Sequence, residues 1–357
     1  MKIRNILCYM ILILLSLLLV ACGGESSSGV QATASPTAGR VNGFGTALNH
    51  VHSMLALPNH VLVLATHYGL FRSADDGATW QEVAGGPHQL MDGLMTYSLQ
   101  VSPLDSNRLY VLTLPSVIPH TGTLGLYTSA DQGRTWTLSI PTASLTSSSI
   151  FMVAPGNDTP NEVYIYLPDL GPLGLRLSLD AGQHFSSTGM LPFGRILGLL
   201  AIPGAPGQLL AYGNDGIARS TDGGNHWQVL KNIQGGIIDV ATAGPLRPIY
   251  ASGDAGIYVS HDGGKTFQLV YTRASFGSLT ASQLQPNMLY GETGLSIYRS
   301  DDGGHTWTLL PRIKGNLAPL AADPNNAAGV YLSLSYPTAV YHLVSDEKSW
   351  QSLTPPA

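Results

Sequence analysis

Short alternating apolar segments recur along the chain between residues 50 and 353, and each leads into a glycine-containing turn. Gly69-Leu70-Phe71-Arg72 and Gly256-Ile257-Tyr258-Val259 are two of them. Alternation with a period of two predicts β-strands rather than helices. Two further apolar runs precede each such segment, as Ile237 to Val240 and Pro248 to Tyr250 do in one unit. With the strand that follows the turn, each unit is expected to hold four strands.

The turn itself has one pattern, Ser-x-Asp-x-Gly-x-Thr/His-aromatic, which occurs six times. The copies run from Ser73 to Trp80, Ser129 to Trp136, Ser178 to Phe185, Ser220 to Trp227, Ser260 to Phe267 and Ser300 to Trp307. A seventh copy, Leu343 to Trp350, keeps only Ser349 and Trp350. Successive aromatic residues are 40 to 56 positions apart. Such a period is typical of a repeat architecture that spans the whole chain.

The residue types in this turn have a physical explanation. An Asp carboxylate can accept backbone N–H bonds within a tight loop, and Gly tolerates the positive φ that such a loop requires. We therefore assign a structural role to the six aspartates, with calcium binding by the turns as the alternative. They are Asp75, Asp131, Asp180, Asp222, Asp262 and Asp302. His184 and His226 stand at the Thr position and receive the same structural interpretation.

The repeated turn resembles the Asp-box, or BNR, repeat of sialidases, of sortilin-type receptor domains and of the photosystem II stability and assembly factor family. The resemblance covers roughly residues 50 to 353. It implies an all-β fold, a seven-bladed β-propeller of four-stranded blades over residues 41–357, with the boxes on the outer rim. Radial repetition leaves few exposed sheet edges. Six blades with a cap, or eight blades, are the alternatives, and no swapped strand that would close the ring is evident.

The composition narrows the function classes. Charged residues make up 11% of the 357 residues, 17 basic and 22 acidic, against about a quarter in ordinary proteins. A nucleic-acid partner is therefore excluded. The sequence also has no Gly-rich phosphate loop, no His-Glu-x-x-His motif, no nucleophile elbow and no Cys pair for zinc or redox work. These absences set the corresponding enzyme classes aside.

The N-terminus reads as a lipoprotein signal peptide, residues 1–21. Two basic residues, Lys2 and Arg4, precede an aliphatic run from Ile11 to Val20 that is too short to span a bilayer. The run ends in Leu-Val-Ala-Cys22, which resembles the lipobox of bacterial lipoproteins and implies diacylation of Cys22. An ordinary secretory signal is the alternative. Cys8 would leave with the leader, so no disulfide is expected.

Residues 22–40 are rich in Gly and Ser and lack an apolar period, which predicts a flexible tether. Without the two leader cations, 15 basic and 22 acidic residues remain. This excess of acidic residues does not favour adhesion of the protein surface to anionic membrane lipids. The membrane contact is therefore expected to be the lipid attached to Cys22. We expect a monomer in the cell envelope, on the outer face of the cytoplasmic membrane or at the cell surface.

The resemblance to sialidases implies a Tyr–Glu nucleophile, an Asp acid/base and three arginines on the substrate carboxylate. The candidate arginines, Arg72, Arg219 and Arg299, instead fall in the strand before a box. Tyr290 and Glu292 are two positions apart, but Tyr recurs at this repeat position. We read these residues as scaffold and leave the catalytic residues unassigned. The leading hypothesis is a binding module for a protein or glycan ligand at the channel mouth, and a glycoside hydrolase is the alternative.

Histidines crowd into the first two units. His50, His52, His60, His67 and His88 lie within 39 residues. The segment from residue 49 to 54 is predicted to be the innermost strand of the first blade, whose alternation puts His50 and His52 on one face. His67 is predicted at the bend between the second and third strands. Two imidazoles so placed are typical of a metal site. We expect a divalent metal or a polar ligand there, or else internally bonded histidines.

The histidine segment also resembles a group of bacterial BNR-repeat lipoproteins described as glycosylhydrolase-like. The resemblance rests on His-x-His-Ser, on Ala-Thr-His-x-Gly-Leu-Phe-Arg-Ser and on the later Pro119-His120. That group usually has Asp two residues before Met95, where this chain has Gly93, with Asp92 one position earlier. Asp92 and His120 are therefore further ligand candidates. Asp239 is the carboxylate expected near the channel, with a hydrogen-bonded strand Asp as the alternative.

Overall fold

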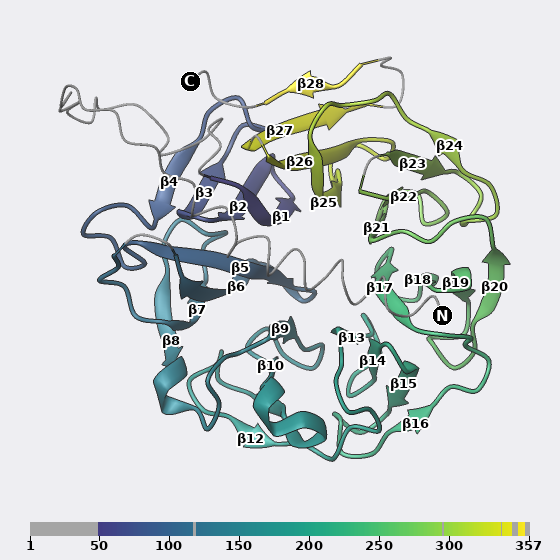
Figure 1. Ribbon diagram of the computed structural model, residues 1–357, viewed down its shortest axis with the longest axis horizontal. Helices are drawn as coiled ribbons and strands as arrows, with labels where there is room; N and C mark the ends of the chain where they lie inside the picture. Colours follow the sequence, from purple (N-terminus) through teal and green to yellow (C-terminus); the bar gives the residue numbers. More distant parts are fainter. Residues whose placement is uncertain (1–48, 117–118, 295, 337, 345–348, 354–357) are drawn as a thin grey trace, which may run out of the picture. The chain divides into compact units, whose positions relative to one another are not determined.

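The fold consists of seven antiparallel sheets, each built from four consecutive strands. The computed structural model describes residues 49–116, 119–294, 296–336, 338–344 and 349–353. The expected leader, the tether and Cys22 lie outside these ranges, as does the centre of the seventh turn. Figure 1 shows the seven sheets arranged around a common centre. The prediction of an all-β, seven-bladed propeller of four-stranded blades is confirmed.

The first strand of each blade lies innermost and the second pairs with it. The first strands are β1 (Val51–Leu57), β5 (Leu94–Ser102), β9 (Met152–Pro155), β13 (Gly198–Ala201), β17 (Ile237–Thr242), β21 (Ser278–Ala281) and β25 (Asn316–Ala322). The second strands are β2 (Val61–Thr66), β6 (Asp105–Pro115), β10 (Val163–Tyr166), β14 (Leu209–Gly213), β18 (Ile249–Gly253), β22 (Leu289–Glu292) and β26 (Val330–Tyr336).

The third and fourth strands complete each blade toward the outside, and in blades 1 to 6 the box turn joins them. The third strands are β3 (Gly69–Ser73), β7 (Gly125–Ser129), β11 (Leu175–Ser178), β15 (Gly216–Ser220), β19 (Gly256–Ser260), β23 (Ile297–Ser300) and β27 (Thr338–Leu343). The fourth strands are β4 (Gln81–Ala84), β8 (Thr137–Pro141), β12 (Ser186–Ser187), β16 (Gln228–Val229), β20 (Gln268–Tyr271), β24 (Thr308–Leu309) and β28 (Gln351–Ser352). Two short 3₁₀ helices, η1 (Thr142–Ser144) and η2 (Pro168–Leu173), lie in loops.

The ring closes without a swapped strand, because every sheet takes its four strands from one continuous stretch of chain. Strand β1 of the first blade contacts β25 and β26 of the seventh. Side-chain hydrogen bonds between described residues also join these blades. The Tyr331 hydroxyl donates to Asp76 Oδ1 at 3.0 Å, and Trp80 Nε1 donates to the Leu353 carbonyl at 2.8 Å. Apolar packing and these bonds therefore close the ring.

A repeated tyrosine of the second strand links neighbouring blades. Tyr110 donates to the Pro160 carbonyl, Tyr250 to the Pro286 carbonyl and Tyr290 to the Ala328 carbonyl, at 3.0, 2.9 and 2.8 Å. Each of these three side chains is at most 1% exposed. A buried hydrogen bond of this kind contributes about 1 kcal/mol, and losing one partner costs more. The recurrence of Tyr at this position is thus explained by inter-blade contact.

The box turns repeat one network of hydrogen bonds. In the first, Gly77 N–H donates to Ser73 Oγ at 2.8 Å, and Ser73 Oγ donates to Asp75 Oδ1 at 2.7 Å. The Thr79 backbone N–H and hydroxyl donate to the two carboxylate oxygens of Asp75 at 2.9 and 2.6 Å. Gly77 has φ +88°, which a side chain would strain. The other five boxes repeat the Ser–Gly and Asp bonds.

In two boxes a histidine ring takes the place of the Thr hydroxyl. His184 Nδ1 lies 2.7 Å from Asp180 Oδ2, and His226 Nδ1 lies 2.6 Å from Asp222 Oδ2. The hydrogen bonds from the His226 side chain and backbone lower the pKa of Asp222 to about 2. Each carboxylate is therefore already engaged in hydrogen bonds within the turn that contains it.

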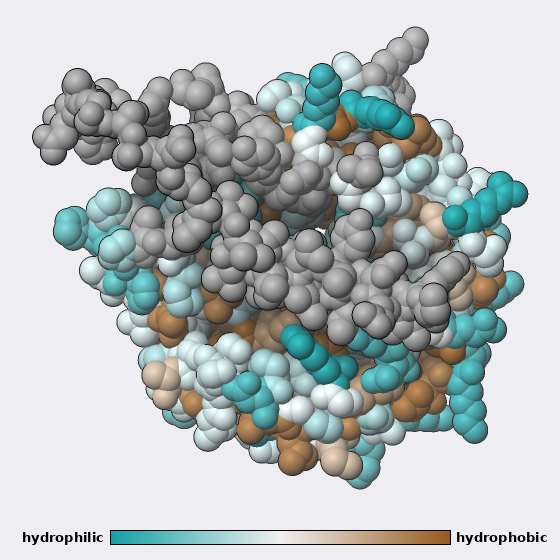
Figure 2. All heavy atoms as spheres, viewed as in Figure 1, coloured by the Kyte–Doolittle hydropathy of each residue, from teal (hydrophilic) through white to brown (hydrophobic). Residues whose placement is uncertain are grey.

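Within the described residues no helix has the length and apolar character needed to cross a membrane. On the part of the face in Figure 2 that grey atoms do not cover, hydrophobic residues are scattered among hydrophilic ones. Single exposed apolar residues are ordinary on a protein surface.

Candidate functional site

The histidine cluster is built by the first two strands of blade 1 and the turn after them. His50 immediately precedes β1, His52 lies in β1, and His67 follows β2 in the turn to β3. The predicted place of His67 at the bend between strands is confirmed. The His67 N–H donates to the His50 carbonyl at 3.0 Å, which holds the two backbone segments together.

A β-bulge, rather than simple alternation, sets the direction of the His52 ring. The register between β1 and β2 pairs Val51 with Thr66 and then Ser53 with Ala65, which leaves His52 as the extra residue. A bulge of this kind bends a strand and redirects a side chain. The sequence predicts a regular strand alternation through His50 and His52. The register shift contradicts that regularity, although the two rings do lie close together.

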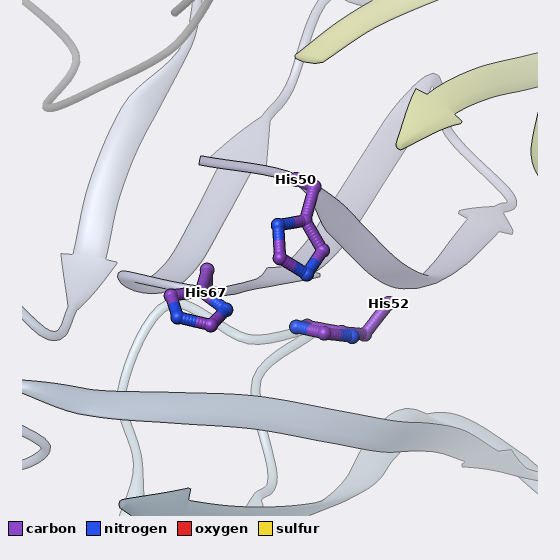
Figure 3. Close-up of side chains that lie close together, drawn as sticks. All are labelled: His50, His52 and His67. Carbon is purple, nitrogen blue, oxygen red and sulfur yellow. The ribbon is translucent and has the colours of Figure 1, made fainter. Parts of the chain in front are cut away.

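The three imidazoles lie close together. Their ring centroids are 4.5 Å apart for His50 and His52, 4.6 Å for His50 and His67, and 5.8 Å for His52 and His67. One ring nitrogen from each residue lies within 4.8 Å of the others. Figure 3 shows one nitrogen of every ring facing the space between the rings. The sequence prediction that these three histidines converge is confirmed.

Burial keeps this cluster neutral. Desolvation, with the neighbouring His67, lowers the pKa of His50 to about 4. Desolvation, with His50 and His67, lowers the pKa of His52 to about 3. The pKa of His67, a residue 5% exposed, is lowered by desolvation as well. Each ring therefore carries a free nitrogen lone pair at neutral pH, which is the form that binds metal.

Two buried nitrogens of the cluster have no hydrogen-bond partner in the part of the chain that the structure describes. They are His52 Nε2 and His67 Nδ1, and both atoms are buried. Buried polar atoms in folded proteins are nearly always paired, and an unpaired one costs about 1–3 kcal/mol. A metal bond to imidazole nitrogen is about 2.0–2.1 Å long, so a tetrahedral ion brings its ligand nitrogens to about 3.3 Å apart. The three nitrogens, now within 4.8 Å of one another, would have to move closer together to hold such an ion.

Asp92 and His120, the ligand candidates predicted in blade 2, lie outside this cluster. His120 is exposed, and its Nδ1 lies 3.1 Å from the Gly122 carbonyl. Asp92 Oδ2 accepts from the Thr121 hydroxyl at 2.8 Å and from the His88 N–H at 3.2 Å. In the described part of the chain, the group of potential metal ligands at blade 1 includes neither residue. The structure thus gives Asp92 and His120 local hydrogen bonds in a surface loop.

Asp239 lies on β17 as predicted, where it joins two blades. Its Oδ2 accepts from the Leu279 N–H of blade 6 at 2.8 Å, and its Oδ1 accepts from the Val240 N–H at 2.9 Å. Ser53 makes the equivalent inter-blade bond in blade 1, accepting from the Leu99 N–H at 2.8 Å. Burial raises the pKa of Asp239 to about 6. The carboxylate therefore links two blades at the hub, the centre of the propeller where the innermost strands lie.

A pocket of about 720 Å³ opens between the inner strands of blades 2 to 5, and Gln283 of blade 6 closes one side. Its wall includes Ser98, Met152, Leu199, Tyr212, Thr242 and Arg247. Among the described residues that line it, Arg247 is the only charged one, and none is Asp or Glu. The sequence predicts a site at the hub but does not point to Arg247, since no motif distinguishes this residue from other loop arginines.

Comparison with protein-family models and with curated protein sequences gives no match. Solved structures do match. The GH74 xyloglucanase from Xanthomonas campestris aligns with 86% of this chain and 55% of its own at 16% identity and a TM-score of 0.65. YCF48 from Cyanidioschyzon merolae aligns with 84% of this chain and 97% of its own at 14% identity and a TM-score of 0.59.

A structure of YCF48 bound to D1 peptide aligns with 73% of this chain and 85% of its own, at 19% identity and a TM-score of 0.50. The chain spans about half the length of the GH74 enzymes that it matches. Identities this low show the fold alone. The chain is thus a seven-bladed β-propeller with four-stranded blades, similar in fold to GH74 enzymes and to YCF48.

Proposed function

We propose that this chain is a binding module of the cell envelope, which binds a protein or glycan ligand in the pocket lined by blades 2 to 5. The observation that carries the proposal is the pocket wall, which offers one cation, Arg247, amid neutral residues and no carboxylate among its described members. Such a wall suits binding, because glycosidic bond hydrolysis needs two carboxyl groups about 5–10 Å apart. The peptide-bound YCF48 structure supports a polypeptide ligand on this fold.

The glycoside hydrolase alternative points to Asp239 and Glu292. The charge of Glu292 contributes to the raised pKa of Asp239, and burial raises the pKa of Glu292 as well. Raised carboxyl pKa values are typical of acid/base residues. The likeness to GH74 enzymes favours the same alternative. Against it, both oxygens of Asp239 already accept backbone N–H bonds.

The test of binding screens the detergent-purified full chain against glycans and envelope proteins. The expected result is a ligand whose affinity falls at least tenfold in Arg247→Gln and is unchanged in Arg273→Gln, an exposed arginine outside the pocket. Release of sugars that disappears in both Asp239→Asn and Glu292→Gln would favour the hydrolase instead. Equal affinity in the two arginine variants would contradict a site in this pocket.

The proposal includes export and anchoring through a lipid on Cys22. Support comes from the sequence alone, in the aliphatic leader that ends at this cysteine. In Cys22→Ser the protein is expected to leave the membrane fraction, which fractionation and immunoblotting of cells would measure. Membrane retention equal to that of the unchanged chain would contradict the lipid anchor.

A divalent transition-metal ion at the His50, His52 and His67 cluster completes the proposal. Support comes from the neutral, converging rings and the unpartnered nitrogens. Elemental analysis of protein purified without an affinity tag is expected to find about one ion per chain, and His52→Ala is expected to lose it. His261→Ala, which changes an exposed histidine outside the cluster, is the matched control. Equal, near-zero metal in all three proteins would rule the ion out.

A further inference from the structure

Blade 5 builds the same hub backbone as blade 1 with no histidine at the three hub positions. The Asp254 N–H donates to the Gly236 carbonyl at 3.0 Å, as the His67 N–H does to the His50 carbonyl. The register of β17 and β18 shifts between Ile237 and Asp239, which leaves Ile238 as the extra residue. Gly236, Ile238 and Asp254 thus occupy the positions that His50, His52 and His67 occupy in blade 1.

Blades 5 and 1 differ in whether the polar side-chain atoms at the hub have hydrogen-bond partners. In blade 5 the Asp254 carboxylate accepts the Gly236 N–H at 2.8 Å, so the turn side chain stabilises its own backbone. In blade 1 the corresponding turn residue, His67, has an unpartnered Nδ1. The backbone therefore forms without the three histidines, and two of the nitrogens that they bring to the hub have no hydrogen-bond partner among the described residues.

We infer that the metal ion at this cluster keeps one coordination position open and there binds an imidazole or carboxylate side chain of a protein ligand. This inference rests on the proposed function, since it takes both the ion and a polypeptide partner from it. It goes further in assigning the cluster to the docking of that partner.

The number of protein ligands supports an open position. Structural zinc sites are closed by four protein ligands, whereas sites with three keep a fourth position for an outside group. In the part of the chain that the structure describes, the group of His, Cys, Asp and Glu side chains that could hold the ion has three members. His50 and His52 are partly exposed, so part of the cluster is accessible from outside, although His67 is buried.

The donor chemistry favours a polypeptide over a sugar. Three imidazole nitrogens select borderline ions such as Zn²⁺, Ni²⁺ or Cu²⁺, for which imidazole is a good ligand and a carboxylate an acceptable one. Neutral hydroxyl oxygens, which a glycan offers, suit harder ions such as Ca²⁺. Tyr68 packs edge-on against His67 with ring centroids 5.4 Å apart, which leaves the His67 ring less free to turn away.

The experiment uses the full chain, purified without a tag, stripped of metal with a chelator and reloaded with Co²⁺. Imidazole and then acetate are titrated as probes while the visible absorption of the bound cobalt is recorded. An open site is expected to give a saturable spectral change with one imidazole per ion. A cobalt spectrum that does not respond to either probe would overturn the inference and leave the metal proposal standing.

Absence of any bound cobalt would instead refute the metal proposal itself, so the two failures are distinguishable. His52→Ile, which installs the blade 5 residue, is expected to lose the cobalt spectrum, and His261→Ala to keep it. Because a hub substitution can disturb folding, circular dichroism of each variant is compared with that of the unchanged chain. Should His52→Ile fail to fold, His50→Gln replaces it, and a spectrum unchanged in that variant would contradict the site.

Discussion

The outer rim and the hub of this propeller use their repeats in opposite ways. On the rim, six box turns repeat the same hydrogen bonds, and even the exchange of Thr for His keeps the bond to the Asp carboxylate. At the hub, blades 1 and 5 share a bulge and a backbone hydrogen bond but carry different side chains. The rim residues are therefore constrained by one hydrogen-bond network, whereas the same backbone at the hub accepts different side chains.

The largest effect is expected at the hub carboxylate Asp239. Its pKa is about 6 in the folded protein against about 3.9 when unfolded. Between these values the folded state holds a proton that the unfolded state has lost, so the contribution to stability is present below pH 3.9 and is lost as the pH rises to 6. The loss amounts to at most about 3 kcal/mol at 1.36 kcal/mol per pH unit.

Asp239→Asn cannot titrate and should lack this fall in stability between pH 4 and 6. Chemical denaturation of both proteins across that range measures it, with the exposed Asp215→Asn as the control. Parallel pH profiles for Asp239→Asn and the unchanged chain would show that the carboxylate is not desolvated at the hub.

The second effect concerns the rim. Ser220 is 1% exposed, and its hydroxyl accepts the Gly224 N–H at 2.9 Å. Ser220→Ala leaves that buried N–H unpaired, which is expected to lower the free energy of unfolding by about 1–3 kcal/mol. Ser260→Ala removes the equivalent bond in the next box and should cost about the same. Urea denaturation measures both, and a cost near zero in one box alone would break the equivalence of the rim turns.

A third substitution is expected to raise the free energy of unfolding rather than lower it. His52→Ile places the blade 5 residue in blade 1 and removes a buried nitrogen that has no partner. In the presence of a chelator the variant is expected to be more stable by about 1 kcal/mol, because functional residues often cost stability. Thermal or urea denaturation without metal measures this gain. A loss of more than about 1 kcal/mol would mean that His52 is a packing residue, unlike Ile238.

The repeat made the fold predictable from the sequence. Six copies of one turn fix the period, the apolar runs between them give the strand count, and the resemblance to Asp-box repeats implies the rim position of the turns. The convergence of His50, His52 and His67 was predictable for the same reason, because the repeat places their segments at the hub. The bulge at His52 was not predictable, since the shift is set by pairing with β2 rather than by any residue type. Arg247 was missed because its pocket is assembled from strands of several blades.

The smallest effect is expected for His226→Thr on the rim. Thr79 shows that a Thr at this position makes the same two bonds, from its backbone N–H and its side chain, to the box carboxylate. The His226 side chain is 91% exposed, so its replacement disturbs no packing. The free energy of unfolding should change by less than about 0.5 kcal/mol, and the metal content should not change at all. Since His226 and His52 are both histidines, a silent change at the rim and a lost ion at the hub would show that position in the blade, rather than residue type, determines function. A rim variant that also lost the ion would refute that division.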